Sequence, residues 1–260
     1  MVSPSARTSC DAAALRCATA VLLLGLGAGV HAAHPLLSED TGTQGTGKFE
    51  LELGNAWTRD GANRAYEFGP QLSYGMLPNL DAILRPTLVA VRTTTDGAAT
   101  TARGAGDTAV DAKWRFYDAG MFSLATRAGI GVPTGDADRG LGAGKPTYHA
   151  LLVASFVAAP LTLHANLGYT RGASDPMTRR DLFHASTAAL VSVGSAWQLL
   201  LYDVAFDTNP ERARATAPGV VRIGAIYTVR KGCNIDVGYQ ARLNRAAPAT
   251  GLQVGLTLQW

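Results

Sequence analysis

Polar and apolar residues alternate strictly along much of the chain. In residues 48–53, Phe and Leu take turns with Lys and Glu, and residues 251–260 place Leu, Val or Trp at every second position. A repeat of two is the period of a β-strand with one apolar face. Helical periodicity is not sustained over any useful length. The pattern therefore predicts an all-β chain.

The alternation predicts twelve strands of 10–13 residues each. Strands in soluble proteins usually have about 5–6 residues, whereas a tilted transmembrane strand needs about 9–11. Strand length therefore favours an antiparallel, up-and-down transmembrane β-barrel over a soluble sandwich. The predicted strands are 48–58, 64–74, 80–92, 107–117, 121–133, 146–157, 161–171, 181–193, 197–207, 219–229, 233–242 and 251–260.

The lengths of the connections between these strands alternate as well. Outer-membrane barrels have long extracellular loops and short periplasmic turns, so this alternation predicts that both termini face the periplasm. The odd-numbered connections are 59–63, 93–106, 134–145, 172–180, 208–218 and 243–250. The even-numbered connections are 75–79, 118–120, 158–160, 194–196 and 230–232.

Aromatic residues gather near the two ends of the predicted strands, as expected of rings at the two lipid–water boundaries. The chain also ends on an alternating strand with Trp260, which resembles the signal by which the barrel-assembly machinery recognises outer-membrane proteins. One group contains Phe49, Tyr74, Trp114, Phe116, Phe122, Phe156, Trp197, Tyr227 and Trp260. The other contains Trp57, Tyr66, Tyr148, Tyr169, Phe183, Phe206 and Tyr239.

Residues 1–33 are typical of a secretory signal peptide, with Arg7 and Arg16 ahead of an apolar run at 18–30. That run is too short for a transmembrane helix, which needs about 20 residues. Removal of the signal peptide leaves Cys233 as the remaining cysteine, so an intrachain disulfide is excluded. We therefore expect export to a bacterial outer membrane, with lipid as the surroundings of the barrel.

Composition agrees with this interpretation. The 260 residues are 47% hydrophobic and 17% charged, against about 25% charged in typical soluble domains. These values exclude a disordered chain. The net charge of +3 is too small to suggest nucleic-acid binding. No linker or low-complexity tract divides residues 34–260, so we expect a segment at 34–47 followed by one barrel at 48–260.

Four stretches carry a resemblance to a known family: HPLLSEDTGTQGTGKFELE from His34, GDTAVDAKWRFYD, GIGVPTGDADRGLGAGK and LTLHANLGYTR. Together they resemble the outer-membrane transporter family named "putative MetA-pathway of phenol degradation", over most of the chain after the signal peptide. The resemblance implies an outer-membrane β-barrel distantly related to channels for hydrophobic compounds. It brings no catalytic residue and no cofactor.

The strand pattern turns a set of polar residues toward the lumen. They either line a narrow channel that contacts a small solute or pair with one another and plug the barrel. Eight-stranded barrels are filled by side chains and those of 16–18 strands leave aqueous channels, so twelve strands allow both. The predicted lumen residues are Glu50, Glu52, Glu67, Gln71, Arg85, Asp107, Asp111, Lys113, Arg115, Arg127, His164, Asn166, Asp203, Arg222, Asp236 and Gln240.

Two glycine-containing segments flank this lumen. Residues 34–47 have no period, and they either enter the barrel as a plug, with Leu36 and Leu37 seeking a dry site, or form a disordered tail. Residues 133–146 contain Asp136 and Asp138 but lack the Glu that closes an EF-hand loop. We expect a flexible surface loop there, and no metal site.

An enzyme is the competing interpretation, because some outer-membrane barrels are lipid hydrolases. His184 and Ser186 share one face of a strand, as a nucleophile and its base would. That face is opposite the apolar face, and no orienting acid is evident. We therefore expect a channel for passive uptake of small solutes, aromatic or hydrophobic ones among them. A lipid-modifying hydrolase and a sealed structural or binding barrel are the alternatives.

Overall fold

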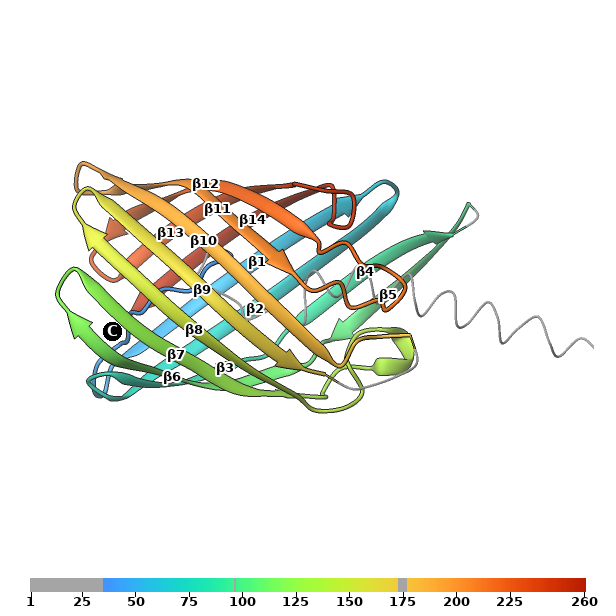
Figure 1. The fold of residues 1–260 in the computed structure, drawn as a ribbon, viewed down its shortest axis with the longest axis horizontal. Coiled ribbons are helices and arrows are strands. Elements are labelled where there is room, and N and C mark those ends of the chain that lie inside the picture. Colours follow the sequence, from blue (N-terminus) through green and yellow to red (C-terminus); the bar gives the residue numbers. More distant parts are fainter. Residues whose placement is uncertain (1–34, 96, 173–176) are drawn as a thin grey trace, which may run out of the picture.

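The computed structural model describes residues 35–95, 97–172 and 177–260, and the predicted signal peptide lies outside these ranges. The described chain forms one closed antiparallel β-barrel (Figure 1). Closure comes from the first strand, which pairs with the second strand on one side and with the last strand on the other. Among the described residues, no helix is long and apolar enough to cross a membrane.

Fourteen strand segments make up the twelve strands of the barrel wall, and we call each full-length wall strand a stave. Two staves each consist of two segments, β3 with β4 and β5 with β6. The segments are β1 (Phe49–Asp60), β2 (Asn63–Leu77), β3 (Leu80–Arg85), β4 (Leu88–Thr95), β5 (Ala98–Ala105), β6 (Thr108–Ala119), β7 (Phe122–Val132), β8 (Thr147–Ala158), β9 (Leu161–Arg171), β10 (Asp181–Val193), β11 (Trp197–Asp207), β12 (Gly219–Arg230), β13 (Cys233–Arg242) and β14 (Thr250–Gln259).

The third stave is interrupted where the sequence pattern predicted the unbroken strand 80–92. Pro86 lies between β3 and β4, and proline has no N–H to donate to a neighbouring strand. Before the interruption in the chain, β3 pairs with β6, and after it β4 pairs with β5. A hydrogen bond of 2.9 Å from the Gly106 amide to the Thr87 carbonyl joins the two parts.

The predicted loop 93–106 is wrong, because most of it belongs to the hairpin β4–β5. Threonines favour the pleated strand, and Thr93 pairs with Thr100 across this hairpin. Gly97 has a φ of +81°, which a tight turn requires and glycine accepts without strain. Figure 1 shows β4 and β5 projecting beyond the rim and away from the neighbouring staves.

The connections distinguish the two ends of the barrel. The end that carries Trp260 has short turns at 78–79, 120–121, 159–160, 194–196 and 231–232, and we call it the turn end. The opposite end, which we call the loop end, carries longer connections at 133–146, 172–180, 208–218 and 243–249. The first two connections at the loop end are two residues each, because β1, β2, β4 and β5 extend into the ranges predicted as loops.

The outer face of the barrel is apolar. Leu167 at the middle of β9 and Ile223 on β12 are 64% and 55% exposed. Aromatic rings pair at both ends, Trp197 with Tyr227 at 4.7 Å on the turn end and Trp57 with Tyr66 at 5.3 Å on the loop end. This outside-apolar arrangement is that of a barrel surrounded by lipid.

A bulge in β6 shifts the register between Arg115 and Tyr117. The bulge leaves Phe116 and Tyr117 both exposed, although they are neighbours in the strand. The ring of Tyr117 consequently lies 6.2 Å from that of Phe122. Tyr117 therefore joins the aromatic group at the turn end, to which the sequence pattern did not assign it.

Candidate functional site

The interior of the barrel is polar and densely hydrogen-bonded. Thirteen of the sixteen polar residues predicted to face the lumen are 8% exposed or less. Alternation along each strand places them opposite the apolar outer face. They are Glu52, Glu67, Gln71, Arg85, Asp111, Lys113, Arg127, His164, Asn166, Asp203, Arg222, Asp236 and Gln240.

The other three predicted lumen residues, Glu50, Asp107 and Arg115, lie near the barrel ends and are less buried. Glu50 accepts hydrogen bonds from the side chains of Gln44 at 2.8 Å and Gln259 at 2.7 Å. Asp107 accepts hydrogen bonds from two backbone amides of the loop 133–146 at 3.0 and 2.7 Å. Arg115 lies at the turn end, with its Nε 3.5 Å from a carboxylate oxygen of Asp118. Asp107 therefore anchors a loop instead of lining the central lumen.

Residues 35–47 lie against inward-facing side chains of the barrel wall, and we call them the inner segment. Asp203 accepts hydrogen bonds from the backbone amide of Ser38 at 3.0 Å and from its hydroxyl at 2.7 Å. The Leu37 amide donates to the same carboxylate. Leu36 packs against Leu190 and other apolar residues of β10 and β11. Polar and apolar contacts thus both hold this end of the segment.

Glu39 lies at the centre of the inner segment and is 2% exposed. Its Oε1 is 2.7 Å from Lys113 Nζ and its Oε2 is 2.8 Å from Arg127 NH1. Its backbone exchanges two hydrogen bonds with the side-chain amide of Asn166, at 2.7 and 3.0 Å. Asp40 lies 3.2 Å from Lys113 Nζ, and this ammonium holds the pKa of the Asp40 carboxyl well below its usual range.

Thr41 and Gln44 of the inner segment bond to wall side chains in the same way. The Thr41 amide donates to Ser155 Oγ at 3.1 Å, and the Thr41 hydroxyl lies 2.5 Å from Ser123 Oγ. The Gln44 amide lies 3.1 Å from both carboxylate oxygens of Asp81. These contacts reach from β3 to β11, so the segment crosses the lumen.

Arg127 connects the inner segment to the wall. Its Nε donates to Asp111 at 2.8 Å and its NH2 donates to Gln71 at 2.9 Å. His149 Nε2 lies 2.7 Å from the second oxygen of Asp111. Buried charges require such pairing, because burial removes the water around an ion and only a partner of opposite charge compensates for that loss. On the adjoining strands β2 and β3, Arg85 forms an ion pair with Glu67.

Arg222, which is also buried, bonds to the start of the inner segment. Its NH1 donates to the Pro35 carbonyl at 2.8 Å and its NH2 donates to Gln240 at 2.7 Å. Asp236 is also buried, and its Oδ1 has no hydrogen-bond partner among the described residues. The two charges are not in ion-pair contact, so this side of the lumen is less fully satisfied than the side around Arg127.

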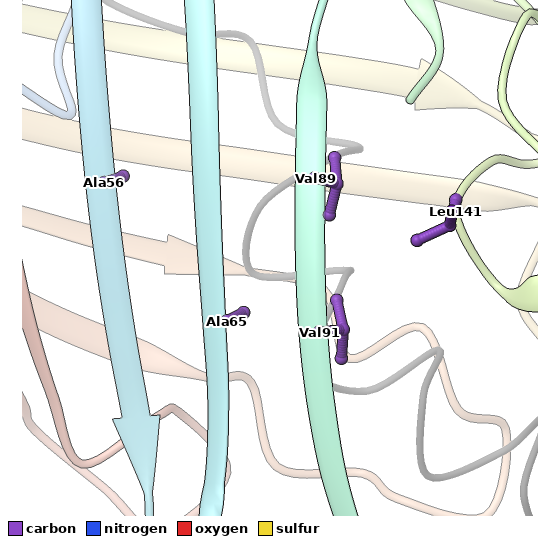
Figure 2. Packing of buried hydrophobic residues seen from close by; sticks show 5 residues of the cluster. All are labelled: Ala56, Ala65, Val89, Val91 and Leu141. Atoms are coloured by element: carbon purple, nitrogen blue, oxygen red, sulfur yellow. The ribbon is translucent and has the colours of Figure 1, made fainter. Parts of the chain in front are cut away.

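Most residues of the loop 133–146 are exposed, as expected of a surface loop, but one of its side chains is turned inward at the loop end. Leu141 is 3% exposed and points toward Val89 and Val91 on the inner face of β4, beside Ala56 and Ala65 (Figure 2). We call these five residues the apolar mouth patch. The anchoring of the loop by Asp107 explains this position.

Sequence reasoning missed several lumen groups. Asp81 is 1% exposed, and it shares a strand face with Arg85 four residues later, so alternation alone could have identified it. Ser155 follows by the same rule from its position on β8. Glu39 lies outside any alternating stretch, and no pattern in the sequence relates it to Lys113.

His184 and Ser186 face the lumen as predicted from alternation, and the structure adds a partner. His184 Nε2 lies 3.0 Å from Ser186 Oγ, and His184 Nδ1 lies 2.8 Å from Asp207 Oδ1. Asp207 is the register partner of His184 on β11. Asp207 is therefore the acid that could not be identified from the sequence. The three side chains are hydrogen-bonded in sequence, serine to histidine to aspartate, as in a catalytic triad. Ser186 is 7% exposed.

A family model described as "Putative MetA-pathway of phenol degradation" matches residues 37–260. No curated protein matches the chain in sequence.

Solved structures show the same architecture. An outer membrane channel from Pseudomonas putida F1 has a TM-score of 0.69 at 10% identity, covering 85% of this chain and 98% of that one. The NanC porin has a TM-score of 0.58 at 9% identity, covering 80% and 98%. The KdgM porin has a TM-score of 0.52 at 9% identity, again covering 80% and 98%. At these identities the likeness concerns the fold.

Proposed function

The chain belongs to the family described as "Putative MetA-pathway of phenol degradation", and on that premise we propose that it is an outer-membrane channel for passive uptake of small solutes. The observation that carries this proposal is a closed barrel with an apolar exterior and a polar interior. Similarity in fold to an outer membrane channel and to two porins supports it.

The orientation follows from the two barrel ends. We place the turn end in the periplasm and the loop end outside the cell, because outer-membrane barrels carry their longer loops outside. Export by the predicted signal peptide and insertion by the barrel-assembly machinery belong to the same proposal. Lipid then contacts the exposed leucines and isoleucines of the outer face, and nucleic acid is not a partner.

The solute is proposed to be small, because the inner segment occupies the lumen. Passage requires this segment to shift, since Glu39 and Ser38 are buried against opposite parts of the wall. The apolar mouth patch is buried under Leu141 near the outer opening, and movement of the loop 133–146 would expose it to aromatic or hydrophobic solutes. The family name, which refers to phenol degradation, supports the same class of solutes.

Planar-bilayer recording of the purified full chain tests this function. We expect small, discrete conductance steps in potassium chloride, because the inner segment leaves little open cross-section. Liposomes that contain the protein should also admit phenol faster than liposomes that contain a sealed eight-stranded barrel. Absence of both conductance and solute flux would contradict a channel.

Ser186, His184 and Asp207 favour a second candidate, a hydrolase of esters that enter from the loop end. In this mechanism the Ser186 hydroxyl attacks the ester carbonyl and its proton moves to His184 Nε2, while Asp207 orients the ring through Nδ1. The leaving alcohol then takes the proton from His184, and water releases the acyl group by the reverse transfer.

A direct assay separates this candidate from the channel. Hydrolysis of p-nitrophenyl acetate or of phospholipid that is lost in Ser186→Ala would establish the hydrolase. Thr187→Ala on the same strand is the matched control, because its hydroxyl donates to the His164 carbonyl and not to His184. Equal background rates in the wild type and in Ser186→Ala would exclude the hydrolase and leave the channel.

A further inference from the structure

We propose that Lys113 and Arg127 form a binding site for the carboxylate of a small organic monoanion, and that Glu39 occupies this site as an internal ligand. The inference rests on the proposed channel function and names a solute class for it. It does not require a large pore, because the site lies where the inner segment already crosses the lumen.

The geometry around Glu39 is that of a bound carboxylate. One oxygen takes a hydrogen bond from Lys113 Nζ at 2.7 Å and the other takes one from Arg127 NH1 at 2.8 Å. All three side chains are 8% exposed or less. Both cations belong to barrel strands, β6 and β7, whereas Glu39 belongs to a segment with no strand of its own. The cations are thus a rigid clamp, and the anion is the part that can be exchanged.

The charges select a monoanion. Arg127 keeps Asp111 as a partner whether or not Glu39 is present, at 2.6 Å between NH2 and Oδ2. Among the described residues, the carboxylates in ion-pair contact with Lys113 are Glu39 and Asp40, both of the inner segment. When that segment moves away, the ammonium of Lys113 loses both of these counter-ions. Such a group is costly to leave unpaired, so the vacated site favours an incoming negative charge.

Backbone groups of residues 38–41 are also held by side chains of the wall. Asn166, Ser155 and Asp203 bind backbone groups of residues 38–41 with side-chain atoms. The strands keep their own backbone pairing when the segment leaves. These polar side chains then become available to water or to the solute, while the barrel stays closed.

One group competes with a solute for Lys113. Asp81 is the cross-strand register partner of Lys113 between β3 and β6, and in the folded chain it binds the Gln44 amide. Departure of the inner segment frees Asp81 as well as Lys113. A direct Asp81–Lys113 pair would close the site, and the experiment therefore has to distinguish solute binding from this self-pairing.

Isothermal titration of the full chain in detergent with sodium benzoate tests the site. Glu39→Gln keeps the shape of the internal ligand and removes its charge, so we expect it to bind benzoate about tenfold more tightly than the wild type, or better. Benzyl alcohol, which lacks the carboxylate, should bind neither protein. Asp81→Asn in the Glu39→Gln background should tighten benzoate binding further.

One further variant and two controls locate the binding. Lys113→Met in the Glu39→Gln background should abolish benzoate binding, while Lys231→Met in the exposed β12–β13 turn should leave it unchanged. Glu211→Gln, in the connection 208–218, should behave as the wild type does. Equal benzoate affinity with and without Lys113, or no binding to Glu39→Gln at millimolar benzoate, would overturn the proposal.

A measurement on the unmodified chain covers the case in which Glu39→Gln does not fold. Benzoate that displaces Glu39 should accelerate amide hydrogen exchange at Ser38, Glu39 and Thr41, whose N–H groups bond to the wall. Benzyl alcohol should not change this exchange. Unchanged exchange at saturating benzoate contradicts the site, whereas the channel itself is tested by its conductance in potassium chloride.

Discussion

At the scale of single residues, the lumen around Arg127 and Asp203 is a network in which buried charges depend on specific partners. Arg127 is 2% exposed and contacts Asp111, Glu39 and Gln71. Asp203 is fully buried and binds the inner segment. Hydrogen bonds to charged groups contribute about 1.5–3 kcal/mol each. Single substitutions in this network should therefore have large and separable effects on opening and on stability.

Asp203→Asn should loosen the inner segment, because a neutral amide oxygen accepts from Leu37 and Ser38 more weakly than a carboxylate. We expect a several-fold larger single-channel conductance, recorded in planar bilayers. Asp60→Asn, at an exposed position near the loop end, is the matched control and should conduct as the wild type does. A wild-type conductance in Asp203→Asn would show that the Asp203 contacts do not hold the lumen closed.

Arg127→Met should destabilise the folded barrel by about 3–5 kcal/mol, because it leaves buried carboxylates without their cation. The measurement is the urea midpoint for unfolding from lipid vesicles. Arg115→Met is the control, since Arg115 is partly exposed and its ion pair with Asp118 spans 3.5 Å. Exposed pairs contribute about 0–1 kcal/mol, so similar midpoints for the two variants would contradict the network described for Arg127.

At the scale of elements, two irregularities shape the loop end. Pro86 interrupts the third stave, and the hairpin β4–β5 continues beyond the rim. The loop 133–146 then packs against the inner face of this hairpin through Leu141 (Figure 2). In place of the interrupted stave and this hairpin, the sequence pattern predicted an unbroken strand at 80–92 and a loop at 93–106.

Leu141→Ala should release the loop 133–146, because truncation of a buried leucine costs about 2–5 kcal/mol. We expect trypsin to cleave after Arg139, which lies in this loop, at least about tenfold faster than in the wild type. Leu252→Ala, on the exposed face of β14, should leave the cleavage rate unchanged. If both variants are cleaved at the wild-type rate, Asp107 alone holds the loop.

At the scale of the whole molecule, the barrel reverses the usual distribution of polarity. Exposed leucines, valines and aromatics cover the outside of the wall, and the charged residues lie in the interior, at the barrel ends and in the connections. The low proportion of charged residues, 17%, follows from this arrangement, because half of each strand faces outward. The inner segment crosses the lumen among these inward-facing side chains.

Leu167→Arg should oppose folding in phospholipid vesicles, because arginine near the bilayer midplane costs about 2–4 kcal/mol. Leu243→Arg, in the connection 243–249 at the loop end, should cost about 0–1 kcal/mol. The two variants are compared by the fraction of folded protein, which is measured from the difference in gel mobility between unheated and heated samples. Equal folded fractions would contradict the assignment of β9 to the membrane-spanning wall.

The pattern along the sequence by itself determined the all-β class, the twelve staves and the face to which most residues point. These features are local, because the pleat alone alternates side chains with a period of two. The same rule placed Lys113, Arg127 and Asp203 inside, and it could also have placed Asp81 there. It could not detect the interruption at Pro86 or the extension of β4–β5, which depend on how neighbouring strands pair.

Only the tertiary structure decided which of these residues meet. Glu39 contacts Lys113 from 74 residues away, Ser38 contacts Asp203 from 165 away, and Asp207 meets His184 through the register of β10 and β11. Closure of the barrel brings such groups together, and the energy of a buried charge then depends on the partner it meets. The polar character of the lumen is thus a property of the sequence, while the carboxylate held between two cations is a property of the fold.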